Sequence, residues 1–205
     1  MTDPGVLLLY GNDEYAIEQR LAGFESAFDD PAGAALNLTR LEGSSMTEDE
    51  LNNAVNAMPF LAQQRLVIVS NPSGRYTTPE QRRKLCDFIE RTPATTRLVI
   101  REDMETRTLR DKARQEREDD HNWLVKWFRK SGLAMERCAL PAPWQMTEWI
   151  VRQAKQQGGQ IEPPAAARLA EMVGTNPQQA ARELDKLLAY ANWSRPVRLD
   201  DVQAV

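Results

Sequence analysis

Histidine and cysteine, which build zinc sites and many catalytic centres, are scarce in this sequence. It contains one histidine, His121, and two widely separated cysteines, Cys86 and Cys138. A structural zinc site needs four Cys or His ligands at short spacings, so these residues cannot supply one. The cysteines form no C-x-x-C pair, which indicates reduced thiols in a cytoplasmic protein. A single histidine in a charged segment gives no nucleophile or acid–base constellation, so we expect no catalytic residues.

Long apolar runs and a surplus of positive charge are missing as well. The apolar run Val6–Tyr10 is far too short for a membrane span or a signal-peptide core, and no basic residue precedes it. The formal net charge is -4, from 26 Lys and Arg against 30 Asp and Glu. Proteins that grip DNA with their whole surface are usually basic. We therefore expect a cytoplasmic protein without membrane contact, in which any DNA role is local or shared with partner subunits.

The first 140 residues alternate strand patterns with helical patterns. Continuous apolar runs are typical of strands buried on both faces of a parallel sheet. Helix signals separate these runs, such as the capping box of Thr47 and Glu50 and the pair Thr78–Pro79. The order predicts an α/β domain with a mostly parallel sheet. The predicted strands are 6–10, 36–41, 66–69, 98–100 and 133–140.

Residues 141–205 contain helix signals and no strand pattern. Pro163–Pro164 and Asn176–Pro177 each open a helix, and an earlier helix includes Ile150. We predict a small domain of three helices at 141–205, joined to the domain at 1–140 by a proline-containing linker.

One segment of the first domain departs from the alternation. Residues 102–122 are dense in charge and nearly free of large apolar side chains. Such a segment buries little surface, so we predict a solvated, partly helical loop that proteases cut first.

An α/β domain followed by a small helical lid is the layout of AAA+ proteins, which raises the question of ATP binding. A phosphate loop of the form G-x-x-x-x-G-K-[ST] would then join the first strand to the first helix. The turn here is Gly11, Asn12, Asp13 and Glu14, and the second Gly, the Lys and the Ser/Thr of the motif are missing. Its two carboxylates would repel a polyphosphate. We interpret the turn as a degenerate phosphate loop and expect no cofactor and no metal.

Two further parts of a nucleotide site are absent. After the strand that ends at Val69, the chain has Ser70–Asn71 where ATPases of this layout place Asp-Glu. The turn 174–177 carries no arginine, although AAA+ lids often present one there. Three independent losses argue against ATPase activity.

Several motifs resemble the delta subunit of the bacterial DNA polymerase III clamp loader. Residues 9–15 resemble the opening of that family, and 58–69 resemble its second signature. Residues 183–187 resemble the third, and 199–202 resemble the junction before the family's collar domain. The similarity covers essentially the whole chain.

The resemblance implies a AAA+ fold that has lost ATP binding. It implies a non-catalytic subunit that binds and opens the sliding clamp, the beta subunit, for loading onto primed DNA. The gamma/tau and delta-prime subunits would be its partners, and DNA would be met through the complex. The DNA polymerase and nucleotidyltransferase activities belong to the holoenzyme. The sequence stops before the collar domain, so we expect that domain to be absent.

The resemblance also implies a clamp-binding element at Met58, Pro59, Phe60 and Leu61. In the family, two exposed apolar residues at this place enter a pocket on the clamp, which implies that role for Phe60 and Leu61. The pattern alone favours a different interpretation, because apolar residues between a helix and a strand usually enter the core. By pattern, Met58 also lies on the inner face of the helix that begins after Thr47, and Pro59 ends or kinks that helix.

Two alternatives remain open at the level of sequence. The chain could be delta-prime or another ATP-binding loader subunit, which measurable ATP binding would favour. It could also be a AAA+-derived scaffold protein unrelated to replication, which would show no affinity for a clamp.

Overall fold

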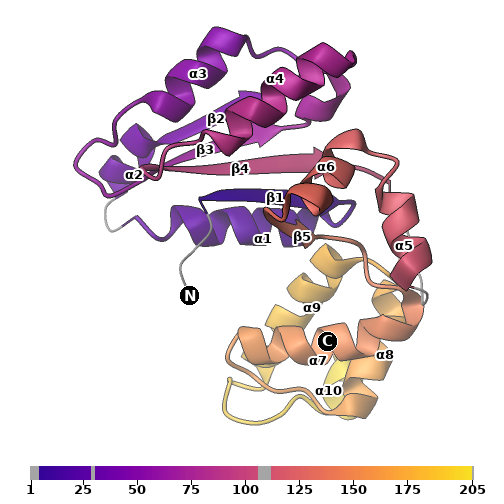
Figure 1. Ribbon diagram of the computed structural model, residues 1–205. Helices are drawn as coiled ribbons and strands as arrows, with labels where there is room; N and C mark the ends of the chain where they lie inside the picture. Colours follow the sequence, from indigo (N-terminus) through magenta and orange to yellow (C-terminus); the bar gives the residue numbers. More distant parts are fainter. Residues whose placement is uncertain (1–4, 29–30, 106–111, 205) are drawn as a thin grey trace. The chain divides into compact units, whose positions relative to one another are not determined.

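The computed structural model describes residues 5–28, 31–105 and 112–204 (Figure 1). The chain divides into two compact units, Met1–Ala139 and Leu140–Val205. The boundary expected from the sequence, after residue 140, falls one residue later. Each unit has its own hydrophobic core.

The first unit is built on a five-stranded sheet in the order β2-β3-β4-β1-β5, in which every neighbouring pair is parallel. The apolar β1, β3 and β4 are the three central strands, which confirms the prediction that continuous apolar runs lie inside a parallel sheet. The strands are β1 (Val6–Gly11), β2 (Leu38–Glu42), β3 (Arg65–Ser70), β4 (Thr96–Asp103) and β5 (Ala134–Arg137).

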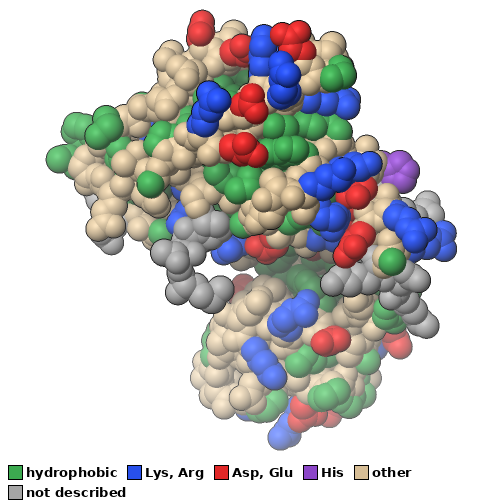
Figure 2. Space-filling view, viewed as in Figure 1, with side chains coloured by type: hydrophobic (Ala, Val, Ile, Leu, Met, Phe, Trp, Pro, Cys, Tyr) green, Lys and Arg blue, Asp and Glu red, His purple; other side chains and the backbone are tan. Residues whose placement is uncertain are grey.

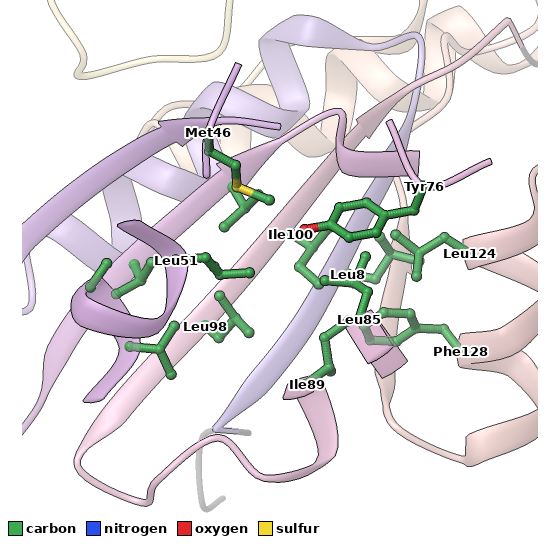
Figure 3. Close-up of a cluster of buried hydrophobic side chains, with 14 of the residues drawn as sticks. Leu8, Met46, Leu51, Tyr76, Leu85, Ile89, Leu98, Ile100, Leu124 and Phe128 are labelled. Atoms are coloured by element: carbon green, nitrogen blue, oxygen red, sulfur yellow. The ribbon is translucent and has the colours of Figure 1, made fainter. Parts of the chain in front are cut away.

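Helices cover both faces of this sheet. Figure 1 shows α3, α4 and α6 on one face and α1 on the other. Leu8 faces the first layer and Leu9 the second, because successive strand residues point to opposite faces. Figure 3 shows the first layer, where side chains of α3, α4 and α6 pack onto Leu98 and Ile100. The helices are α1 (Glu14–Glu25), α2 (Pro31–Asn37), α3 (Glu48–Asn56), α4 (Pro79–Glu90), α5 (Lys112–Asp119) and α6 (Trp123–Ser131).

Among the described residues, four of these helices begin at side-chain caps that their sequences provide, namely α1, α3, α4 and α6. Thr47 accepts from the backbone N of Glu50, whose carboxylate bonds back to Thr47, so the predicted capping box is present. Thr78 forms the same arrangement with Gln81 at the start of α4. Asn122 accepts from the backbone N of Leu124 at the start of α6.

Two strand predictions need correction. Residues 36 and 37 end α2, and β2 begins only at Leu38. The alanine-rich stretch after Pro31 favours helix, and it has no apolar periodicity by which it could be found. The last strand is also shorter than predicted, since β5 covers Ala134–Arg137.

The charged segment is not a solvated loop throughout. Its first two residues belong to β4, and it contains α5. Glu102, Gln115 and Asp119 are buried, so the prediction is wrong for these three residues. Residues 106–111 lie outside the described ranges.

The second unit is helical. Its helices pack around Ile150, Leu169, Leu184 and Leu188. Besides the three predicted helices, the described residues include a short fourth, which begins at Leu199, where Asp200–Val202 also resemble the start of a helix in the sequence. The helices are α7 (Met146–Gln156), α8 (Pro163–Val173), α9 (Pro177–Tyr190) and α10 (Leu199–Ala204). Within the described ranges of both units, no helix has the length and apolar content needed to cross a membrane.

Candidate functional site

The degenerate phosphate loop lies at the turn from β1 to α1, tightly packed against the segment that follows β5. Gly11 has a φ of 141°, and a Cβ added there would lie 1.9 Å from the carbonyl O of Cys138. The backbone N of Asp13 donates to that same oxygen over 2.9 Å. In a phosphate-binding loop, backbone N–H groups point at the ligand instead.

The side chain of Asp13 interacts with helix α1 and not with a ligand. Its carboxylate, which is buried, accepts from the backbone N of Ala16 over 3.0 Å and caps α1. Burial raises the pKa of this carboxyl above its ordinary value, while the hydrogen bonds oppose that shift.

A cavity of about 380 Å³ lies at the carboxyl ends of β1 and β4, where nucleotides bind in related α/β folds. Its one described cation is Arg101, which pairs with Glu18 at 2.6 Å and Asp103 at 2.7 Å and has Glu14 at 3.7 Å. The guanidinium charge is thus matched by carboxylates, and a polyphosphate would meet net negative charge. The cavity lining is Gly11, Asn12, Glu14, Arg101, Asp103, Met104 and Glu105.

The end of β3 also lacks the carboxylate of an ATPase. Asn71 adopts a left-handed conformation, with a φ of 53°. Its side chain donates to the carboxylate of Asp103 over 2.9 Å and accepts from the backbone N of Asp103 over 2.8 Å. Asn71 therefore links the end of β3 to β4 by hydrogen bonds.

The second sequence-predicted site is the connection between α3 and β3, residues 57–64. It exposes three large apolar side chains, with 79% of Met58, 55% of Phe60 and 92% of Leu61 accessible to solvent. Exposure of Phe60 and Leu61 agrees with the expectation drawn from the family. Figure 2 shows hydrophobic side chains gathered at this edge of the first unit, on the left.

The prediction that Met58 lies on the inner face of a helix is wrong. The helix α3 ends at Asn56, and Ala57 is already extended, with a ψ of 141°. The chain therefore leaves the helix two residues before Met58, which turns that side chain outward. Pro59 follows in the connection and is half-buried.

Hydrogen bonds hold both ends of the connection on the domain. The hydroxyl of Thr96 donates to the carbonyl O of Val55 over 2.7 Å, just before the connection begins. The side-chain amide of Gln64 donates to the carbonyl O of Ala94 over 2.8 Å, just before β3 begins. The exposed apolar residues therefore lie on a short segment with fixed ends.

A groove of about 810 Å³ adjoins the connection. Phe60 and Leu61 form one part of its lining, and Phe24, Phe28 and Leu36 contribute further apolar surface. Phe60 is about half exposed and lines this groove, so its ring is not part of the hydrophobic core.

Sequence reasoning missed the buried polar contacts around these sites. Asn37 is 1% exposed and bonds the backbone of Phe60, but it lay in a segment that we predicted as strand. Asp119 is buried and pairs with Arg137 at 3.0 Å. Neither residue carries a sequence signal beyond its polarity, because the partners lie 23 and 18 positions away.

The fold and the two sites together define a class of protein. It is a AAA+-like α/β domain whose first strand-to-helix turn lacks the second Gly, the Lys and the Ser/Thr of a phosphate loop, followed by a small helical unit. Within that class, the chain belongs to the family described as DNA polymerase III, delta subunit, whose family model matches residues 7–131.

Individual relatives agree with this assignment. The chain is 26% identical over 201 residues to the DNA polymerase III subunit delta of Bacillus subtilis, covering 97% of this chain and 55% of that protein. The solved structure of the Bacillus subtilis DNA clamp loader delta protein matches with a TM-score of 0.77 at 22% identity, covering 98% of this chain and 57% of that one. The chain thus spans a little over half the length of either relative.

Proposed function

We propose that this chain is the clamp-binding portion of a clamp loader delta subunit. It binds the sliding clamp through Met58, Pro59, Phe60 and Leu61 and favours the clamp's open form during DNA replication. Family membership supports the setting, since one relative is a DNA clamp loader delta protein. The observation that carries the site is the exposure of Met58, Phe60 and Leu61 on one anchored connection. Exposed apolar groups of this kind typically mark interaction surfaces.

The exposed side chains account for useful binding energy. Full burial of a Phe, Leu or Met side chain contributes about 1.5–3 kcal/mol each, and the half-buried Phe60 has correspondingly less to gain. Part of this gain is offset by the loss of motional freedom on association. A micromolar Kd requires about 8 kcal/mol, so these side chains supply part of the binding energy and the surrounding contacts of the interface supply the rest.

To open the clamp, the chain must bind the open form more tightly than the closed form. It does not need to catalyse a reaction. A ligand shifts an equilibrium between two conformations only by as much as it binds one better than the other. An apolar contact on an anchored segment can meet that condition if its pocket on the clamp fits it better in the open form. No reaction in this chain is needed, and we assign the polymerase and nucleotidyltransferase activities to the holoenzyme.

The remaining partners follow from the same setting. We propose that the chain works with the gamma/tau and delta-prime subunits in the cytoplasm and meets DNA through the assembled complex. The formal charge of -4 supports an indirect DNA role, because a surface that grips DNA alone is usually basic.

Binding to the sliding clamp of the same organism tests the proposal. We expect the wild-type chain to bind and the double variant Phe60→Ala/Leu61→Ala to bind at least about thirtyfold more weakly, as loss of an interface hot spot does. Arg83→Ala in α4 is a control, since this exposed residue lies outside the connection. Equal affinity of the double variant and the wild type would refute the assigned site. Absence of binding by the wild type would favour a scaffold unrelated to replication.

A further inference from the structure

The side chain of Asn37 makes an unusual contact with the clamp-binding connection. Its Nδ2 donates to the carbonyl O of Phe60 over 2.8 Å, and its Oδ1 accepts from the backbone N of the same residue over 2.7 Å. Nδ2 also donates to the carbonyl O of Gly33 over 2.8 Å, within α2. One buried amide therefore satisfies both backbone groups of Phe60 and ties them to a helix 23 residues earlier in the chain.

This pairing is specific to an amide. A planar carboxamide carries a donor and an acceptor side by side, which matches the N–H and C=O of one residue. A carboxylate would place an acceptor against the carbonyl O of Phe60, and an alkyl group would remove the partner of both backbone groups. Among side chains of this size, only Asn meets the requirement.

The contact fixes the backbone where the exposed side chains branch from it. Leu61, the next residue, has a φ of 50°, a left-handed conformation that non-glycine residues rarely adopt. Such conformations persist only where the surroundings determine them, and they concentrate at binding sites. Asn37 holds the peptide groups on both sides of the Phe60 Cα, while 55% of Phe60 and 92% of Leu61 stay exposed.

We propose that Asn37 is the positioning residue of the clamp-binding connection. It touches no clamp residue itself. It presets the backbone at Phe60, so that Phe60 and Leu61 reach the clamp already ordered and less entropy is lost on binding. This inference rests on the proposed function, because it assigns a cause to the affinity of that site.

The matched control is a second asparagine at the opposite edge of the sheet. Asn122 caps α6 and donates to Glu102, so Asn122→Ala also loses hydrogen bonds at a partly buried site. Asn37 lies beside the amino-terminal ends of β2 and β3, and Asn122 lies beside the carboxyl-terminal end of β4. A general loss of stability should therefore affect the Phe60 amide and clamp binding similarly in the two variants. Loss of positioning should affect them only in Asn37→Ala.

The first measurement is made on the free chain. Amide hydrogen exchange at Phe60, followed by NMR, should be at least about tenfold faster in Asn37→Ala than in the wild type, because the protecting acceptor is gone. Asn122→Ala should leave the Phe60 amide protected. The isosteric Asn37→Asp keeps an acceptor for the Phe60 amide but loses both donated bonds, so its exchange rate at Phe60 should fall between those of the wild type and Asn37→Ala. Unchanged protection of Phe60 in Asn37→Ala would overturn the proposal without reference to any clamp.

The second measurement is affinity for the sliding clamp, at a temperature where both variants are folded. We expect Asn37→Ala to bind about tenfold more weakly and Asn122→Ala to bind within twofold of the wild type, as ordering of a few side chains predicts. In the background Phe60→Ala/Leu61→Ala, adding Asn37→Ala should have little further effect, because there is nothing left to position.

The outcomes distinguish the proposed clamp-binding function from the positioning role of Asn37. If Phe60→Ala/Leu61→Ala weakens binding but Asn37→Ala and Asn122→Ala weaken it equally, the positioning role is refuted and the clamp site stands. If the wild-type chain does not bind, or the Phe60 and Leu61 variant binds normally, the proposed function fails and the positioning role fails with it.

Discussion

The backbone of Gly11 lies against the carbonyl group of Cys138, so close that a Cβ at Gly11 would lie 1.9 Å from that oxygen. The same carbonyl accepts a hydrogen bond from the backbone N of Asp13. In a phosphate-binding loop the backbone N–H groups of this turn face the ligand, whereas here the N–H of Asp13 is bonded to the protein's own chain. The contact explains why this position of the turn requires a glycine.

Replacing Gly11 should destabilise the first unit severely. In Gly11→Ala the new methyl group meets backbone atoms, which cannot rotate away as a side chain can, and the φ of 141° is itself unfavourable for alanine. We expect the free energy of unfolding to fall by about 3 kcal/mol or more, measured by urea denaturation.

Gly23 provides the matched control. It lies in α1, and a Cβ there would meet nothing within 4 Å. Gly23→Ala should stabilise by about 0.5–1 kcal/mol, because alanine favours helix. A Gly11→Ala protein as stable as the wild type would contradict the close packing of the turn.

The pH dependence of stability should reveal the buried cap of α1. The folded-state pKa of Asp13 is raised above its unfolded value by burial. The charged form is therefore disfavoured in the fold, and the carboxyl's contribution to stability decreases as pH rises through its titration range, from about pH 4 upward. In Asp13→Asn the side-chain O still caps Ala16 but does not titrate.

The difference between the two proteins is the quantity to measure. The melting temperature of Asp13→Asn relative to the wild type should be higher at pH 7 than at pH 3.5. A relative melting temperature that falls from pH 3.5 to pH 7 would show that the charge of Asp13 stabilises the helix more than burial opposes it.

ATP should not bind at millimolar concentration. The cavity at the ends of β1 and β4 offers Arg101 already paired with carboxylates, and the turn at Gly11 has no lysine. Isothermal titration with MgATP should give no saturable heat. Saturable binding with hydrolysis would favour the alternative of an ATP-handling loader subunit.

The sequence predicted the parts of the fold that depend on local or periodic signals. The central strands are continuous apolar runs, and the starts of α3 and α4 have side-chain caps beside them in the sequence. The helix α2 was missed, since it is short and no apolar stripe marks it. The burial of Asp119 and Glu102 was missed as well, because a charge run normally faces water and their partners are distant in sequence.

The candidate site was predicted only from the resemblance to the delta-subunit family, not from the sequence pattern. By pattern alone, Phe60 and Leu61 would have been assigned to the core, and the exposure of both side chains contradicts that assignment. Asn37 could not be found, because its role depends on a contact between α2 and a connection 23 residues further on. Long-range contacts between irregular segments leave no periodicity in a sequence.

A Phe→Ala/Leu→Ala double variant should lower the free energy of unfolding little at an exposed site and strongly at a buried one. Comparing two such variants therefore tests the candidate site without any partner. Phe60→Ala/Leu61→Ala removes side chains that are 55% and 92% exposed, so little apolar contact is lost. We expect the free energy of unfolding to fall by about 1 kcal/mol or less, with the half-buried ring of Phe60 accounting for most of it.

The control pair is Phe128→Ala/Leu124→Ala in α6, where both side chains are completely buried in the first layer (Figure 3). Large-to-small changes at such sites cost about 3–5 kcal/mol for Phe and 2–5 kcal/mol for Leu, so this variant should be largely unfolded or strongly destabilised. Urea denaturation of the two proteins under one set of conditions measures the contrast. A loss at Phe60 and Leu61 as large as that at Phe128 and Leu124 would show that the connection belongs to the core, and it would remove the physical basis for assigning a partner to it.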